Sequence, residues 1–359
     1  MSQLFTPVRL RGVEVRNRVW VSPMCQYSSV DGLPNQWHLV HLGSFARGGA
    51  GLVFTEAAAV LPEGRISPQD AGIWNDEQQA AWAGIVDFLH GQGARAGIQL
   101  AHAGRKGSTL APWEGHGPVA DSDGGWQPVA PSGLAFPGLR EDPRELSAGE
   151  IADVVAAFAA AARRSLEAGF DVLEIHAAHG YLLHQFLSPL SNLRADEYGG
   201  SFENRARLVL DVVDAVRSAV PQETPVLVRI SATDWTDGGW TIEDSVRLAV
   251  LLREHGVDLV DVSTGGNVAR AAIPVGPDYQ VEFADRIRAE AGIATGAVGM
   301  ITEPKQAEEI VARGSADVVL LARTLLRDPH WALRAAHELG VAAGEGVDWP
   351  RQYARAKLD

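Results

Sequence analysis

The segment 173–186 reads LEIHAAHGYLLHQF and brings two histidines and a tyrosine together directly after a short apolar run. His176 and His179 are three positions apart, and Tyr181 lies two positions beyond His179. Such side chains can ligate a metal ion, exchange protons, donate hydrogen bonds to a ligand oxygen, or pack in a core. Their spacing alone leaves these four interpretations open.

Eight short apolar runs recur along the chain, and each is followed by a segment of helical character. The predicted strands are 19–24, 51–57, 96–102, 171–176, 225–231, 259–264, 294–299 and 317–322. The predicted helices are 36–47, 76–92, 147–168, 204–220, 241–255, 283–291, 303–313 and 329–339. Eight β–α units predict an α/β fold in which a parallel sheet closes into a (β/α)8 TIM barrel. An open doubly wound sheet is less consistent, because its Gly-x-Gly-x-x-Gly turn is absent.

Residues 104–144 interrupt this pattern between the third strand and its helix, and they are rich in glycine, proline and tryptophan. Connections of this length are usually functional lids or caps, so we expect a capping excursion here. We expect a single domain over residues 1–359. Its C-terminal tail, 340–359, is predicted to lie at a subunit interface.

Composition excludes several classes of protein. A hydrophobic content of 46% and a charged content of 21% are typical of a soluble globular chain. The net charge of −14 argues against binding to nucleic acid or to a membrane surface, since both require a basic footprint. We find neither a membrane-spanning run nor a secretory signal, and therefore expect a cytoplasmic protein. Cys25 is the only cysteine, which excludes an internal disulfide and a cysteine-built metal cluster.

Polar residues alternate with apolar ones near the ends of three neighbouring predicted strands. Because side chains alternate along a strand, one inward face would carry Gln99, Glu174, His176 and Arg229. TIM barrels place their chemistry at the C-terminal ends of the strands. Unpaired buried polar groups are costly, so their alignment on three strands favours a binding site over a core network.

An amide beside a fixed cation would suit the pyrimidine edge of a flavin. Gln99 can both donate and accept, while Arg229 would stabilise the negative charge of the reduced ring. Barrels often hold a phosphate at the loops after strands seven and eight. In this chain those loops offer Gly299, where the backbone can approach closely, and Ala322–Arg323 at a predicted helix start.

The sequence resembles the old yellow enzyme family of FMN-dependent ene-reductases over nearly its whole length. It is most similar to the bacterial branch of thermophilic-like enzymes and xenobiotic reductases. The resemblance is carried by NRVWVSPMCQYS (17–28), EGRISPQDAGIWND (63–76), GIQLAHAGRK (97–106), GFDVLEIHAAHGYLLHQFLSPLSNLRADEYGGSFENRARL (169–208), VRISATDW (228–235) and TGAVGMIT (295–302). It implies that NADPH or NADH reduces FMN, which then passes hydride to the activated C=C bond of an unsaturated carbonyl or nitro compound.

The resemblance also implies a set of cofactor-binding residues. These are Ser22, Pro23, Met24, Cys25, Ala57, Gln99, Arg229, Gly299, Ala322 and Arg323. Cys25 would lie near the reactive edge of the flavin and tune its potential. Ala322 stands where relatives often have glycine, but its backbone N–H remains, so we expect FMN binding to be retained.

The catalytic and substrate-binding roles are implied in the same way. His176 and His179 would bind the activating oxygen of the substrate, and Tyr181 would donate a proton. Tyr27 would touch the substrate, and Lys106 would lie beside the flavin or the substrate. Arg355 occupies the place of a C-terminal arginine that can reach a neighbouring active site. A homodimer or homotetramer acting on small-molecule activated alkenes is therefore expected.

Two other enzyme classes remain as an alternative function, a metal-dependent hydrolase or a lysine aldolase on a non-flavin barrel. A metal site at His176 and His179 lacks an evident third ligand, and no His-x-His occurs on the first predicted strand. An aldolase lysine normally ends a strand, whereas Lys106 lies four positions beyond His102 in a loop. We therefore interpret the histidines as two N–H donors that stabilise a developing oxyanion, and we expect no bound metal.

Overall fold

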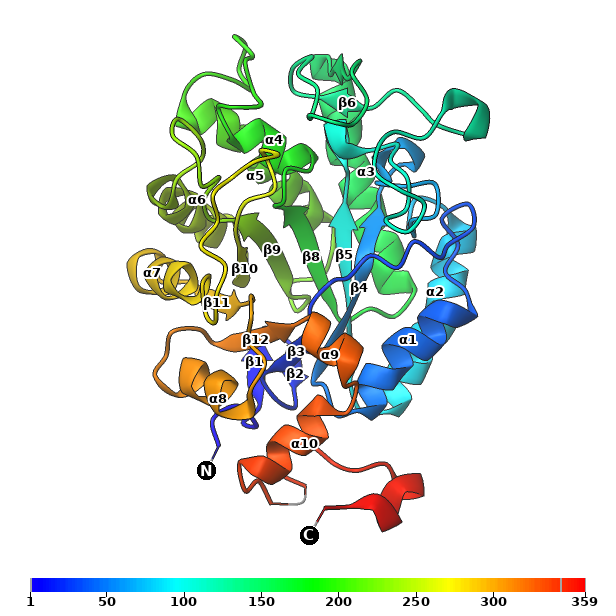
Figure 1. Cartoon of the computed structure of the whole chain (residues 1–359), viewed down its shortest axis with the longest axis vertical. Helices are drawn as coiled ribbons and strands as arrows, with labels where there is room; N and C mark the ends of the chain where they lie inside the picture. Colours follow the sequence, from blue (N-terminus) through cyan, green and yellow to red (C-terminus); the bar gives the residue numbers. More distant parts are fainter. Residues whose placement is uncertain (1, 343, 359) are drawn as a thin grey trace.

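Eight parallel strands form a closed barrel in the computed structural model, which describes residues 2–342 and 344–358 (Figure 1). The barrel strands are β3 (Val19–Val21), β4 (Leu52–Ala59), β5 (Arg95–Ala101), β8 (Val172–Ala177), β9 (Val226–Ser231), β10 (Leu259–Ser263), β11 (Ala294–Ala297) and β12 (Val318–Leu321). Each barrel strand pairs with the next barrel strand along the chain, and β12 pairs with β3 to close the ring. The predicted TIM barrel is confirmed.

A long helix follows each barrel strand and covers the outside of the barrel. These helices are α1 (Gln36–Arg47), α2 (Asp76–Gly91), α3 (Ala148–Glu167), α5 (Phe202–Ala219), α6 (Ile242–Glu254), α7 (Val281–Ala291), α8 (Pro304–Ala312) and α10 (Trp331–Glu338). Side-chain oxygens of Ser147, Ser201 and Thr241 cap the N-termini of α3, α5 and α6. All eight long helices lie where the sequence predicted them.

The C-terminal ends of the barrel strands form the mouth of the barrel. Several strands were predicted to extend further at this end than they do. Residues 22–24, 298–299 and 322 were expected to be extended but lie in loops. The Ser22 N–H still donates to the Leu321 carbonyl, at 2.9 Å, before the chain turns away. The short helices α4 (Leu182–Leu187) and α9 (Arg323–Arg327) were not predicted, because neither is long enough to show a helical period.

A small antiparallel hairpin, β1 (Val8–Leu10) and β2 (Val13–Val15), closes the N-terminal end of the barrel. Leu10 and Val15 pack against an apolar layer inside the barrel that includes Trp20, Phe54 and Leu227. This layer is a floor that separates the hairpin from the polar residues near the mouth. The sequence analysis missed the hairpin, since three-residue strands carry little alternation.

Because every second side chain of a strand points inward, polar side chains follow the apolar floor toward the mouth of the barrel. Leu227 lies in the apolar layer and Arg229, two positions later, lies above it on the same inward face. In β4 the register shifts between Phe54 and Ala57, so that Ala57 pairs with Gln99. This bulge places Ala57, and not Glu56, beside the inward-facing Gln99.

The excursion over 104–144 lies at the mouth end of the barrel, near α4 (Figure 1). It contains the 3-10 helices η2 (Gly104–Lys106) and η3 (Asp121–Asp123) and the strand β6 (Val129–Ala130), which pairs with β7 (Arg144–Glu145). The buried Arg105 holds it by donating to the carbonyls of Leu134, at 3.2 Å, and Asn267, at 2.9 Å. The excursion is therefore attached to the loop after β10.

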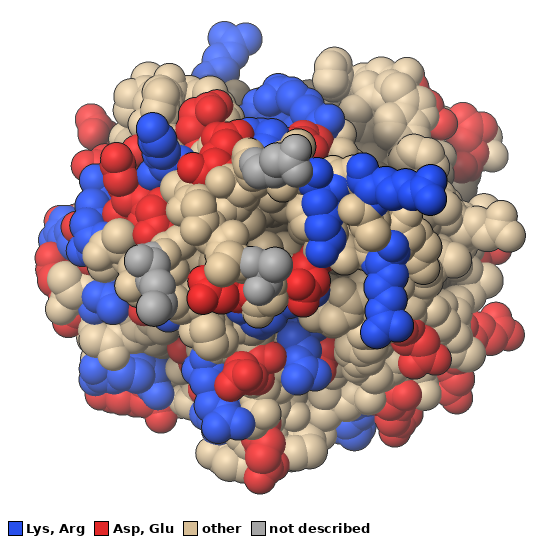
Figure 2. All heavy atoms as spheres, turned by 90° about the horizontal axis from the view of Figure 1, so that it is seen from below, with Lys and Arg blue, Asp and Glu red and all other residues tan. Residues whose placement is uncertain are grey.

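Both chain ends lie at the opposite end of the molecule from the excursion (Figure 1). The C-terminal segment contains the 3-10 helix η4 (Arg351–Ala356), in which Tyr353 contacts Arg47 and His330. On this face acidic and basic side chains are interspersed among uncharged ones (Figure 2). Among the described residues, no helix has the length and apolarity needed to cross a membrane.

The apolar floor predicts a large cost for truncating Phe54, which is 1% exposed and lies against Trp20. We expect Phe54→Ala to lower the free energy of unfolding by about 3–5 kcal/mol, because a cavity remains that its neighbours cannot fill. Chemical denaturation of the two proteins measures this difference. Val40→Ala, at a position that is 70% exposed on α1, is the control and should change stability by less than about 0.5 kcal/mol. Equal effects of the two substitutions would contradict a tightly packed floor.

Candidate active site

Five polar side chains lie in one layer above the floor: Gln99, Glu174, Arg229, Ser22 and Asp261. Gln99 Nε2 donates to Glu174 Oε1 at 2.7 Å, and Arg229 Nη1 donates to Ser22 Oγ at 3.0 Å. Arg229 Nε lies 3.1 Å from Asp261 Oδ2, at ion-pair distance but without hydrogen-bond alignment. The predicted inward placement of Gln99, Glu174 and Arg229 is confirmed.

This layer holds two carboxyl groups for one cation. Burial raises the pKa of Glu174 above its usual value, and the neighbouring Asp261 raises it further, while Arg229 opposes both effects. Burial also raises the pKa of Asp261, again opposed by Arg229. The single positive charge of Arg229 cannot neutralise the negative charges of two carboxylates. One carboxyl group therefore keeps a proton, and the net charge of the layer stays close to zero.

The sequence analysis missed Asp261 and Ser263, although a signal was present. In the run LVDVST, Leu259, Asp261 and Ser263 alternate with apolar residues and therefore share the inward face. The alternation that identified Arg229 on the preceding strand would have identified both residues here.

His176 and His179 lie next to this layer, and their rings are nearly perpendicular. His176 Nε2 is 3.3 Å from His179 Nδ1, and His179 Nε2 is 2.8 Å from Ser263 Oγ. The Ala178 N–H donates to His176 Nδ1 at 3.3 Å, so the proton of a neutral His176 ring is on Nε2. Burial lowers the pKa of both histidines well below 6.5, and Arg229 lowers it further. Both rings are therefore neutral at neutral pH.

Among the residues that the structure describes, no third metal ligand accompanies the two histidines. Within residues 2–342 and 344–358, the His, Cys, Asp or Glu side chains close enough to share an ion are Cys25, Glu56 and Asp70. His176 and His179 belong to no such group, which leaves the pair suited to donating hydrogen bonds.

Lys106 lies beside the histidine pair and ties two loops together. Its ammonium donates to the carbonyls of His179, at 2.8 Å, and Gly266, at 3.0 Å, and lies 5.0 Å from the centre of the Tyr181 ring. Burial lowers the pKa of Lys106 to about 8, and the nearby Arg105 also lowers it. Lys106 thus brings a positive charge next to the Tyr181 ring.

The two tyrosines predicted to act on the substrate both lie near the mouth. The Tyr181 ring packs edge-on against His176, with centroids 5.2 Å apart, and Tyr27 packs against Trp113 of the excursion. Burial raises the pKa of both hydroxyls above 10, and Cys25 contributes to each shift. Each tyrosine therefore keeps its proton at neutral pH.

Cys25 faces two acidic residues that the sequence analysis did not identify. Burial raises the pKa of its thiol, and Asp70 and Glu56 raise it further, so the thiol remains protonated. Glu56 accepts from the Gln26 N–H at 3.1 Å and lies 3.0 Å from His38 Nε2. Burial and the proximity of Glu56 raise the pKa of Asp70 to about 8. Asp70 therefore keeps its proton at neutral pH.

A cavity of about 260 Å³ opens between the loops after β11 and β12. Its lining includes Gly299, Ala322 and Arg323, together with Ser263, which also contacts His179. The Arg323 side chain is exposed, and its one recorded polar contact is with Met300 Sδ, at 3.8 Å. A cation without a carboxylate partner in the described part of the chain, beside a cavity at a barrel mouth, suits an anionic group.

The remaining predicted residues are placed as follows. Pro23, Met24 and Cys25 are half-buried in the loop that leaves β3. Arg355 is exposed in η4, and no recorded contact connects it with the histidine pair of its own chain. Its reach into a neighbouring subunit stays a prediction.

The chain resembles known proteins over its whole length. Residues 3–341 match the NADH:flavin oxidoreductase / NADH oxidase family. An NADPH dehydrogenase of Listeria monocytogenes serotype 4b is 49% identical over 358 residues, which is 99% of each chain. Morphinone reductase, solved in complex with tetrahydroNAD, has 30% identity and a TM-score of 0.79, covering 96% of this chain and 93% of its own. The old yellow enzyme homologue from Zymomonas mobilis has 27% identity and the same TM-score, with 99% of each chain covered.

The raised pKa of Asp70 predicts how stability depends on pH. The folded chain holds a proton up to about pH 8, whereas an unperturbed aspartate loses it near 3.8. The stability due to this proton is fully present below the unfolded pKa and is lost as pH rises through the folded one. Asp70→Asn still accepts from the Ile66 and Ser67 N–H groups and cannot titrate.

We therefore expect Asp70→Asn to lose less free energy of unfolding between pH 5 and pH 8 than the native chain. The difference in slope should approach about 1.4 kcal/mol per pH unit, and denaturation at a series of pH values measures it. Asp153→Asn, at an exposed position of α3, is the control. A slope identical to that of the control would show that Asp70 is ionised throughout this range.

Proposed function

Since the chain belongs to the NADH:flavin oxidoreductase / NADH oxidase family, it is an FMN-dependent NAD(P)H oxidoreductase of the old yellow enzyme type, and we propose that it reduces activated alkenes. The substrate would be an α,β-unsaturated carbonyl or nitro compound. The observation that carries this proposal is the 3.3 Å approach of His176 Nε2 and His179 Nδ1 at the barrel mouth. The alternative of a metal-dependent hydrolase or a lysine aldolase is wrong, because the family uses a flavin.

The free polar groups of the mouth fit FMN. Within the described residues, no hydrogen bond is recorded for the amide oxygen of Gln99 or for Arg229 Nη2, so both can bind the polar edge of a flavin ring. Arg323, Gly299 and Ala322 border the cavity that would take the phosphate. Ser22, Pro23, Met24, Cys25 and Ala57 would line the ring. When bound, FMN supplies the hydride that NAD(P)H has delivered to it.

The histidine pair would hold the activating oxygen of the substrate. His176 already carries its proton on Nε2, facing His179. In the present arrangement His179 Nδ1 accepts from His176 Nε2, because two N–H groups cannot face each other. When a substrate oxygen binds between the rings, the Ser263 hydroxyl can rotate and donate to His179 Nε2, which would place the His179 proton on Nδ1. Both N–H groups then point at one oxygen and stabilise the charge that develops on it during hydride addition. Because both rings are neutral, they act as donors without protonating the oxygen.

Tyr181 would supply the proton to the second carbon of the double bond. It lies two residues beyond His179 and contacts the His176 ring, so it would lie next to the activating oxygen of the substrate. Its proton is retained at neutral pH. The ammonium of Lys106, 5.0 Å from the ring centre, would stabilise the phenolate left behind.

Other predicted roles complete the proposal. Cys25, held as a thiol, would tune the flavin, and Tyr27 would contact the substrate under the excursion. The chain would act as one domain over 1–359, with 104–144 as its cap and 340–359 at a subunit interface. A homodimer or homotetramer in the cytoplasm, with Arg355 reaching a neighbouring site, remains a prediction.

We expect the double variant His176→Ala, His179→Ala to retain FMN but to lose alkene reduction. Removing one oxyanion donor typically costs about 10²-fold or more in turnover, and this variant removes two. The oxidation of the reduced enzyme by cyclohexenone, followed by flavin absorbance, is the measurement. His90→Ala, at a partly exposed histidine paired with Asp171, is the control and should turn over normally. Unchanged cyclohexenone reduction in the double variant would overturn the proposed role of the pair.

We expect Tyr181→Phe to slow the oxidative half-reaction by about 10²-fold, because a general acid usually contributes at least that much. Flavin reduction by NADPH should stay close to the native rate, since the residue is assigned only to substrate protonation. Stopped-flow absorbance separates the two half-reactions. Tyr198→Phe removes a hydroxyl that contacts Asp211, and it should alter neither rate. Equal slowing of both half-reactions by Tyr181→Phe would contradict its role as a proton donor.

A further inference from the structure

His179 belongs to a strained turn. Its φ is +58°, and Gly180 follows with φ +72°, so two consecutive residues adopt the left-handed conformation. For a non-glycine residue this conformation costs about 1 kcal/mol or more and persists only where neighbours enforce it. Gly180 has no space for a side chain, because a Cβ atom there would lie 2.3 Å from the Gly266 carbonyl oxygen.

Side chains from other parts of the site bind every backbone polar group of this turn. The His179 N–H donates to Ser231 Oγ at 2.9 Å, and the His179 carbonyl accepts from Lys106. The Gly180 N–H donates to His184 Nδ1 at 2.9 Å, and the Gly180 carbonyl accepts from Gln185 Nε2 at 2.8 Å. The backbone conformation of His179 is therefore set by these partners.

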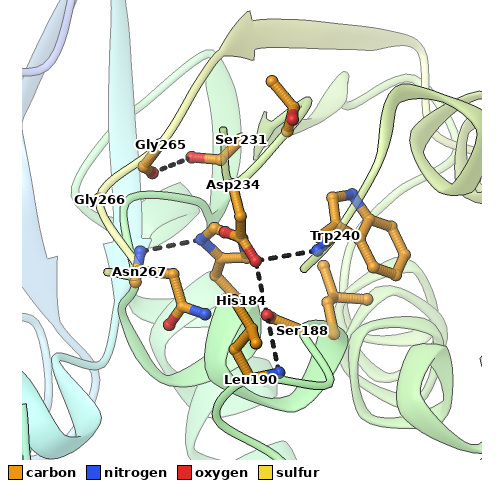
Figure 3. A network of polar contacts seen from close by, with 12 residues as sticks. His184, Ser188, Leu190, Ser231, Asp234, Trp240, Gly265, Gly266 and Asn267 are labelled. Atoms are coloured by element: carbon orange, nitrogen blue, oxygen red, sulfur yellow. Dashed lines mark hydrogen bonds and ion pairs between the residues drawn. The ribbon is translucent and has the colours of Figure 1, made fainter. Parts of the chain in front are cut away.

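His184 differs from the other partners because it is anchored in turn by a buried carboxylate. Its side chain and that of Asp234 are both fully buried, with His184 Nε2 3.2 Å from Asp234 Oδ1, at ion-pair distance but without hydrogen-bond alignment. Asp234 also accepts from Ser188 Oγ at 2.6 Å and from the Trp240 N–H at 2.9 Å (Figure 3). Burial alone would raise the pKa of Asp234, but His184 and these hydrogen bonds lower it to about 2.

The partners of His184 define its tautomer. Because the Gly180 N–H points at Nδ1, that nitrogen must be unprotonated, and the ring proton is on Nε2, facing Asp234. A second proton on Nδ1 would place two donors against each other. The carboxylate thus selects the tautomer that can accept from Gly180, as an orienting carboxylate does for an active-site histidine.

We propose that His184 is a positioning residue for the reaction: anchored by Asp234, it accepts the Gly180 N–H and keeps His179 in the conformation in which its Nδ1 lies beside His176 Nε2. This inference rests on the proposed role of His179 as a donor to the substrate oxygen. In this proposal His184 does not contact the substrate but fixes the orientation of the His179 N–H donor.

Two amide substitutions distinguish a positioning role of His184 from a purely structural role. In His184→Asn the amide oxygen can occupy the place of Nδ1 and accept from Gly180, but the side chain is too short to reach Asp234. In His184→Gln the amide group reaches the place of Nε2 and contacts Asp234, but nothing accepts from Gly180. Both variants thus carry an amide group, which keeps the contact with Gly180 in His184→Asn and the contact with Asp234 in His184→Gln.

We expect His184→Asn to keep a cyclohexenone turnover within about threefold of the native enzyme, and His184→Gln to lose about 10- to 100-fold in kcat, as expected for a misplaced catalytic group. The order of thermal stability should be the reverse, since the Asn variant leaves the buried Asp234 without its histidine. Measurements of kcat, KM, FMN content and Tm on the FMN-bound enzymes test both orders. Ser188→Ala is the control, because it removes a hydrogen bond to Asp234 without touching the turn, and should lower only Tm.

If turnover followed Tm across the three variants, the residue would be structural and the inference wrong. Native turnover in His184→Gln would also overturn it. The double variant of His176 and His179 is assayed alongside. If that variant remains active, the proposed function of the pair fails; if it is inactive while His184→Gln is active, only the positioning role fails.

Discussion

The buried charge of Arg229 is the constraint on which the mouth of the barrel depends. The positive charge of a guanidinium above an apolar floor must be compensated. Asp261 supplies a partner from the adjacent strand β10, and Ser22 supplies one from the end of β3, across the barrel. Its positive charge adds to burial in lowering the pKa of His176 and His179. The same cation that suits an electron-rich ring therefore keeps both imidazoles neutral, as hydrogen-bond donors must be if they are not to act as acids.

The loop after β8, which carries His179, depends on contacts that converge from separate parts of the chain. Lys106 comes from the loop after β5, Ser231 ends β9, and Gly266 follows β10. Together they enclose His179 and leave its ring at the mouth. A turn of two left-handed residues is stable here because each of its backbone groups has a partner, and it would not persist in an isolated peptide.

Much of the fold and part of the site could be predicted from periodicity. Alternation placed Gln99, Glu174 and Arg229 on the inward face, and the eight strand–helix units predicted the closed barrel that the structure has. The β1–β2 hairpin and the helices α4 and α9 were missed, because three to six residues are too few to establish a period. Glu56 and Asp70 were missed for a different reason: they lie fourteen positions apart, and only the folded chain brings them to Cys25.

The sequence by itself determined the barrel, the face of each strand that points inward, and the residue types available for binding a flavin and a substrate oxygen. Only the tertiary structure decided the protonation states and tautomers of these residues. It decided that His176 and His179 are neutral, which ring nitrogens face each other, and that His184 carries its proton toward Asp234. The physical reason is that burial and hydrogen-bond partners set protonation and tautomer, and these partners come from strands and loops distant in the sequence.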